Sequence, residues 1–271
     1  MAEVFWNVRD DLLTAPASIV VAQFWEDDES NRRRSLATFQ EETRIVDEGL
    51  TLYVGAVKGA FGLSDQWKDD VRIRASVAMV LHALNSLLAW RHLLSTGYLA
   101  EARLFTRSIH ESLSQALVFS SDAALASKFF AGHSIQPREI RKRLSQALSD
   151  ADTSAKKVYN DFGELYRRLS SGSHPTLNSF SLRAAAKGPG TAALAKVVPE
   201  EVLIGGFLSD DLGRVARLGL ANNVGAALSS VRLVLPEASG SWDAKYVSYR
   251  ELVERLIGQH DTELHAKGLG A

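Results

Sequence analysis

Apolar residues recur at steps of three and four along most of the chain, which is the spacing of amphipathic helices. The first two long runs predict helices at residues 33–61 and 64–95. The second run is apolar on nearly every side, so we expect it to lie at the centre of the fold. Ser64 is its expected N-terminal cap, and Gly97 is expected to end it.

The third predicted helix spans residues 99–120. Further helices are predicted at residues 121–131, 136–150, 153–169, 209–235 and 247–260. No stretch of alternating apolar and polar residues is long enough for a convincing strand, apart from a short extended piece at 195–198. The pattern therefore predicts an all-α, multi-helix bundle whose second and third helices form a central antiparallel pair.

The chain is expected to form a single helical domain over residues 1–271. Residues 1–32 mix apolar and acidic clusters, which favours short elements packed on the main body. Residues 33–183 are expected to form the core bundle, and residues 184–271 the C-terminal helices followed by a frayed, Gly-rich tail. Small side chains from Gly219 to Ala227 favour the close approach of a neighbouring helix.

Composition narrows the class of protein. The 271 residues are 46% hydrophobic and 23% charged, with a formal net charge of −1, which argues against a general nucleic-acid coat. The absence of cysteine excludes disulfides, thiolate zinc sites and cysteine nucleophiles. The first residues lack the basic-then-apolar order of a signal peptide, and the apolar run at 15–25 is too short to span a bilayer. We therefore expect a cytoplasmic protein without membrane contact.

One charged pair on the third predicted helix stands out. Arg107 and Glu111 lie one turn apart, flanked by Leu104 and Val118 on the face opposite the main apolar stripe. Apolar neighbours favour an ion pair that is partly buried against another element, near the 155–171 helix and His174. The alternative is an ordinary solvated pair.

Basic, hydroxyl and imidazole groups converge between Tyr166 and Pro175, at an expected break in the chain. Gly172 favours a helix end, and a residue that precedes proline is pushed into an extended conformation. His174 is thus expected just beyond a helix C-terminus, where unpaired carbonyls favour a cation. Either Arg167 or Arg168 could fold towards the imidazole ring.

Residues 137–170 carry an excess of basic side chains, including Arg141, Lys142 and Arg143. A run of charges is usually a solvated helix face. Its position directly before His174 supports the alternative that these side chains bind phosphate.

Several kinds of site are absent from the sequence. No histidine follows an acidic residue at the Glu-x-x-His spacing of two-metal helical bundles, and no nucleotide-binding glycine motif occurs. The remaining metal-ligand candidates, His260, Glu263 and His265, fall near the expected frayed end, where solvation is the simpler interpretation. We expect neither a metal nor another cofactor.

The spacing of Arg168 and His174, with five residues between them, resembles the Arg-x(4–6)-His signature of the HEPN superfamily, and Arg167 fits it with six. The segment Tyr-x-x-Leu-Ser-x-x-x-His-Pro (166–175) and the Arg-Ser-Ile-x-Glu helix (107–111) also resemble uncharacterised bacterial helical proteins, some of them associated with abortive infection. The resemblance covers residues 70–180.

This resemblance implies a HEPN-like core and metal-independent RNA cleavage in the cleft of a homodimer, in a toxin or phage-defence system. His174 would transfer a proton as the ribose 2′-hydroxyl attacks the neighbouring phosphate. Arg167 or Arg168 would stabilise the charge on the phosphorane. Ser170 and Ser171 would offer hydrogen bonds.

Tyr166 would position a base or simply pack. The alternative to an endoribonuclease is a noncatalytic module that binds a protein partner or a ligand. In that interpretation Arg107, Glu111, Tyr166 and His174 form a buried polar network that locks the bundle.

Overall fold

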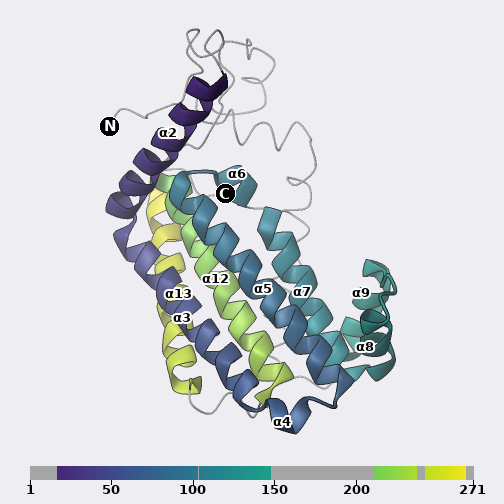
Figure 1. Ribbon diagram of the computed structural model, residues 1–271. Coiled ribbons are helices and arrows are strands. Elements are labelled where there is room, and N and C mark those ends of the chain that lie inside the picture. Colours follow the sequence, from purple (N-terminus) through teal and green to yellow (C-terminus); the bar gives the residue numbers. More distant parts are fainter. Residues whose placement is uncertain (1–16, 103, 148–209, 237–241, 267–271) are drawn as a thin grey trace.

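The computed structural model (Figure 1) describes residues 17–102, 104–147, 210–236 and 242–266. Within these ranges there is no strand, which confirms the predicted all-α, multi-helix bundle. The helices are α2 (Ala17–Thr38), α3 (Gln40–Gly62), α4 (Ser64–Trp67), α5 (Val71–Thr96), α6 (Leu99–Ala102), α7 (Leu104–Ser121), α8 (Ala123–Phe130), α9 (Pro137–Ala147), α12 (Asp210–Val234) and α13 (Asp243–Ala266).

Helices α5 and α7 form the predicted central antiparallel pair. Small polar residues line their seam. The Ser76 hydroxyl donates to the carbonyl of Ala116 at 2.7 Å. His82 Nδ1 and Ser112 Oγ lie 2.9 Å apart, as do the hydroxyls of Ser86 and Ser108. Each step forward along α5 pairs with a step back along α7, so the two helices run in opposite directions.

Helix α12 is the second central element. Its buried residues Leu220, Val224, Leu228 and Val231 join one hydrophobic core with residues of α3, α5, α7 and α13. Apolar burial over several helices is the main stabilising contribution to such a bundle. The Tyr53 hydroxyl of α3 crosses this core to donate to the Val80 carbonyl at 2.9 Å.

Two glycines allow side chains of other helices to approach the backbone closely. A Cβ atom at Gly213 would lie 2.4 Å from the ring of Phe39, and one at Gly49 would lie 2.3 Å from the Tyr249 hydroxyl oxygen. Both glycines lie inside helices, where glycine costs about 1 kcal/mol relative to alanine. Close packing of two aromatic side chains compensates for that cost.

The prediction for the N-terminal part was wrong in two respects. Residues 17–32 belong to one long helix, α2, and not to short elements, and the predicted helix 33–61 is divided at Phe39. Phe39 has φ −117° and ψ 41°, outside helical values. Its ring is fully buried beside Gly213, so the helix bends where this aromatic side chain turns inward.

Other boundaries differ as well. Ser64 begins only the four-residue α4, and Asp70 is the cap of α5, accepting from the Arg72 amide at 2.9 Å. Gly97 ends α5 in the left-handed conformation, with φ 90°, as predicted. The third predicted helix comprises α6 and α7. The predicted helix 153–169 and the extended piece 195–198 lie outside the described residues.

Within the described ranges, α5 is long and apolar enough to cross a membrane by length and composition alone. That property is weak evidence, because the central helix of a soluble bundle shares it. In this bundle α5 packs against α7 through the seam described above, while Arg72, Asn85 and His92 are exposed.

The buried guanidinium of Arg217 on α12 joins three helix segments at one end of the bundle. Its Nη1 donates to the Gly213 carbonyl at 2.8 Å, and its Nη2 donates to the Leu94 carbonyl at 2.9 Å and to the Ser35 hydroxyl. The guanidinium carbon lies 4.1 Å from the centre of the Phe39 ring. Burial lowers the pKa of Arg217 to about 10, still far above neutral pH.

Replacing Arg217 by methionine is expected to lower the free energy of unfolding by about 2 kcal/mol. Methionine retains much of the side-chain volume but leaves the Leu94 carbonyl and the Ser35 hydroxyl buried without their donor. The measurement is urea denaturation followed by circular dichroism. The slope of the unfolding free energy against urea concentration should be the same in the variant and the wild type.

The matched control is Arg232→Met on the same helix, because Arg232 forms a more exposed ion pair with Asp243. Arg232→Met should lower the free energy of unfolding by no more than about 1 kcal/mol. A variant Arg217→Met as stable as the wild type would show that the buried charge costs as much as its hydrogen bonds return.

Candidate functional site

The residues of the Arg/His segment lie outside the part of the chain that the structure describes, and so does the expected contact between α7 and the 155–171 helix. The candidate residues concerned are Tyr166, Arg167, Arg168, Ser170, Ser171 and His174. The described candidates lie on α7 and α9, which pack against each other.

Arg107 and Glu111 form the expected ion pair on α7. Arg107 Nε donates to Glu111 Oε1 at 2.9 Å, and the two side chains are 40% and 36% exposed. Leu104 on the same face is 47% exposed, whereas Val118 is fully buried. The pair is therefore half-buried, which is intermediate between the buried ion pair and the solvated pair that the sequence left open.

His110 lies beside this pair and is largely withdrawn from solvent. Its Nδ1 is 3.4 Å from the Ser114 hydroxyl one turn further along α7. Burial lowers the pKa of His110 to about 4, while the neighbouring Glu111 carboxylate acts in the opposite direction. The imidazole is thus neutral at pH 7, so one ring nitrogen can donate a hydrogen bond and the other can accept one.

Helix α9 is strongly amphipathic. Ile140 is buried against the α7–α8 region, and Leu144 packs against it and against the main core. Arg138, Arg141 and Lys142 project from the other side and are exposed. Their spacing of three and four residues places the three cations in one stripe along the helix.

Arg143 connects α9 to α8. Its Nε lies 3.4 Å from Asp122, which also caps α8 by accepting from the Leu125 amide at 3.0 Å. A second ion pair, Lys128 with Glu139 at 3.7 Å, also links α8 to α9. Arg143 therefore helps to hold α9 on α8, while the stripe of Arg138, Arg141 and Lys142 faces outward.

The segment from Asp122 to Arg143 carries five lysines and arginines against two carboxylates. The whole chain has a net charge of −1, so this surface is a local positive region on a nearly neutral molecule. Such a region attracts polyanions at a defined place without making the protein a general nucleic-acid binder.

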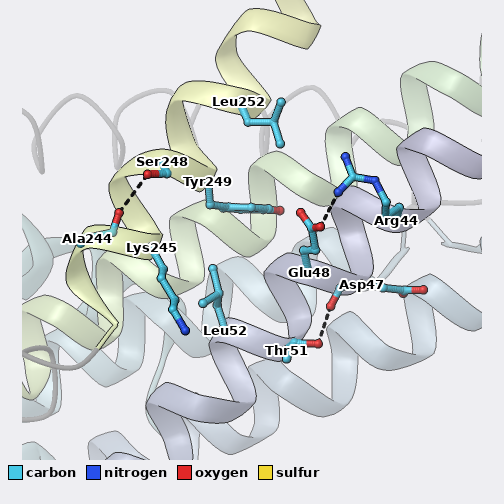
Figure 2. A pocket seen from close by; sticks show the side chains of 10 residues that line it. All are labelled: Arg44, Asp47, Glu48, Thr51, Leu52, Ala244, Lys245, Ser248, Tyr249 and Leu252. Atoms are coloured by element: carbon cyan, nitrogen blue, oxygen red, sulfur yellow. Dashed lines mark hydrogen bonds and ion pairs between the residues drawn. The ribbon is translucent and has the colours of Figure 1, made fainter.

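The structure also contains a groove of about 780 Å³ between α3 and α13, which the sequence pattern does not predict (Figure 2). Leu52, Tyr249 and Leu252 give it an apolar lining. Lys245 and Ser248 of α13 and the charged face of α3 surround them. No local motif could have revealed the groove, because its two walls are about 200 residues apart in the sequence.

His260 does not lie in a frayed, solvated end as predicted. Helix α13 continues to Ala266, and His260 is only 5% exposed rather than part of a solvated tail. Glu263 lies 3.3 Å from Arg214 of α12. Among the described residues no three His, Asp or Glu side chains are grouped as metal ligands.

No protein-family model matches this sequence, and no curated protein or solved structure matches it significantly.

His110 is expected to make stability depend on pH. Its pKa is lower in the folded protein than in the unfolded chain, so the unfolded chain binds the proton first as the pH falls. The contribution of the neutral imidazole to the free energy of unfolding is complete above about pH 6.5 and is lost towards pH 4, amounting to about 3 kcal/mol.

The measurement is urea denaturation of wild type and His110→Gln at intervals from pH 7 to pH 4. The difference in unfolding free energy between them should narrow or reverse as the pH falls. The control is His82→Gln, because His82 also lies at the α5–α7 seam but is exposed to solvent. A wild type and a His110→Gln variant whose curves stay parallel would contradict the prediction.

Proposed function

We propose that the protein is a HEPN-like, metal-independent endoribonuclease that binds RNA along α9. The observation that carries the proposal is the exposed stripe of Arg138, Arg141 and Lys142 on a helix that packs directly against α7. Helix α7 carries the half-buried pair of Arg107 and Glu111. The arrangement supports a phosphate-binding surface beside a polar helix face.

Electrostatics make α9 suitable for a single-stranded polyanion. The apolar side of the helix is used to dock on the bundle through Ile140, so the stripe of cations is available to solvent. Arginine and lysine bind phosphates with little dependence on base sequence. This surface therefore supplies affinity, and it leaves the choice of the cleaved bond to other residues.

The catalytic roles come from the resemblance of the Arg/His segment. His174 would transfer the proton, and Arg167 or Arg168 would stabilise the phosphorane, with Ser170 or Ser171 as hydrogen-bond donors. One arginine and one histidine per chain are few groups for phosphoryl transfer. A homodimer with two facing segments would double them.

The triple variant Arg138→Gln/Arg141→Gln/Lys142→Gln is expected to weaken binding of single-stranded RNA and to make that binding less sensitive to salt. The slope of log Kd against log salt concentration should fall by about 2, since each lost phosphate contact removes about 0.7. The measurement is fluorescence anisotropy of a labelled RNA in increasing KCl.

The matched control is Lys58→Gln/Lys245→Gln/Arg255→Gln, which removes the same charge from exposed positions on α3 and α13. This control should leave the salt slope unchanged. Equal losses in both variants would mean that RNA senses only the net charge, and the α9 surface would be rejected.

Catalysis is tested with mixed RNA in EDTA. Wild type is expected to cleave it, whereas His174→Ala and Arg167→Ala/Arg168→Ala, checked for equal thermal stability, should lose at least about a hundredfold in rate. Light scattering should give the mass of a dimer. A folded, dimeric wild type that does not cleave any RNA in the mixture would contradict the nuclease.

The second candidate is a noncatalytic module that binds a protein partner or a ligand. The observation that favours it is the half-buried pair of Arg107 and Glu111 with the neutral His110 beside it, which suits a structural polar network. In that case His174→Ala would mainly lower the melting temperature and would not change any RNA-directed activity.

A further inference from the structure

The groove between α3 and α13 is separate from the α7–α9 surface. In Figure 1 α3 and α13 lie on one side of the bundle and α9 on the other, with α5, α7 and α12 between them. The groove volume of about 780 Å³ is within the usual range of small-molecule sites, about 300–1,000 Å³.

The floor of the groove is held in place by Tyr249. Its hydroxyl donates to the Ala221 carbonyl of α12 at 2.9 Å, and its ring passes over Gly49 of α3. Burial raises the pKa of the Tyr249 phenol, so the group stays a hydrogen-bond donor. The aromatic ring is therefore fixed at the floor of the groove, with Leu52 and Leu252 on either side of it (Figure 2).

Most charges that line the groove are already paired. Arg44 is bonded to Glu48, and the Asp47 carboxylate accepts two bonds from Arg91 of α5 at 3.0 Å. Lys245 is exposed and has no ion-pair partner among the described residues. Arg44 is shared between Glu48 and Glu41, so Lys245, at the end of the groove where Leu52 lies, is the lining cation without a carboxylate partner among the described residues (Figure 2).

The distance between this charge and the far apolar wall sets the length of a ligand. Lys245 and Leu252 are seven residues apart on one helix, which corresponds to about 10 Å. Apolar side chains occupy the interval. We propose that the α3–α13 groove binds an amphiphilic monocarboxylate of about eight to ten carbons, with the carboxylate on the Lys245 ammonium and the chain over Leu52, Tyr249 and Leu252.

The charge requirement is tested with decanoate and the neutral decan-1-ol, both by displacement of a fluorescent naphthalene sulfonate and by calorimetry. Wild type is expected to bind decanoate about two- to fivefold more tightly than decan-1-ol, the range of an exposed ion pair. Lys245→Gln should abolish this preference, and Lys58→Gln, at an exposed lysine of α3 outside the groove, should keep it.

The location is tested with two tryptophan substitutions on the exposed side of α13. Ser248 lines the groove, whereas its neighbour Val247 is exposed and does not. Ser248→Trp should weaken both ligands at least tenfold, and Val247→Trp should leave them within twofold of wild type.

Equal affinity for the acid and the alcohol in wild type would overturn the proposed ligand class. Binding that survives Ser248→Trp, or no saturable binding below about 1 mM by a folded wild type, would overturn the site. Preferential binding of an amphipathic helical peptide over decanoate would also overturn it, because the groove would then be a protein-docking surface.

Discussion

A buried positive charge with neutral partners determines how the N-terminal helices meet the rest of the bundle. Arg217 is 3% exposed, and no carboxylate is hydrogen-bonded to it among the described residues. Its main compensation is the Leu94 carbonyl, which belongs to the last turn of α5, where unpaired carbonyls and the helix dipole favour a cation. Ser35 and the face of Phe39 complete the enclosure. The bend between α2 and α3 therefore occurs where it can cover this guanidinium.

The direction of α3 after that bend is set by further contacts along its length. Glu42 pairs with Arg214 of α12 at 2.7 Å, and Asp47 pairs with Arg91 of α5 at 3.0 Å. Individually such partly exposed pairs contribute little, but each has a partner in a different helix and so restrains rotation of α3. Arg91 also neutralises Asp47 beside the groove, and Lys245 is the cation of the groove lining that has no carboxylate partner among the described residues.

Helical periodicity was sufficient to predict most of the described fold, because local spacing reports which face is buried. It identified α5, α7, α9 and α12. The antiparallel arrangement of α5 and α7 follows from the short connection between these two helices. It failed at Phe39, where the bend is caused by Gly213 and Arg217, far away in the sequence. It also ended α13 too early, since burial of His260 against the bundle is a tertiary effect. The cationic stripe of α9 was predictable, but the anchoring of Arg143 by Asp122 was not.

The size of the side chains at each helix crossing explains why one helix pair encloses a groove and another does not. Serines and alanines at the α5–α7 seam let those helices approach closely. Hydrogen bonds of the serine hydroxyls then connect the two helices where larger side chains would keep them apart. At the α3–α13 crossing, Tyr249 reaches past Gly49 to the backbone of α12 and fills the position where α13 would otherwise lie against α3. The ring keeps the two helices apart above α12, and the space between them remains open beside it. The residue pattern of either helix alone does not predict this space, because the space depends on a glycine in one helix and a tyrosine in the other.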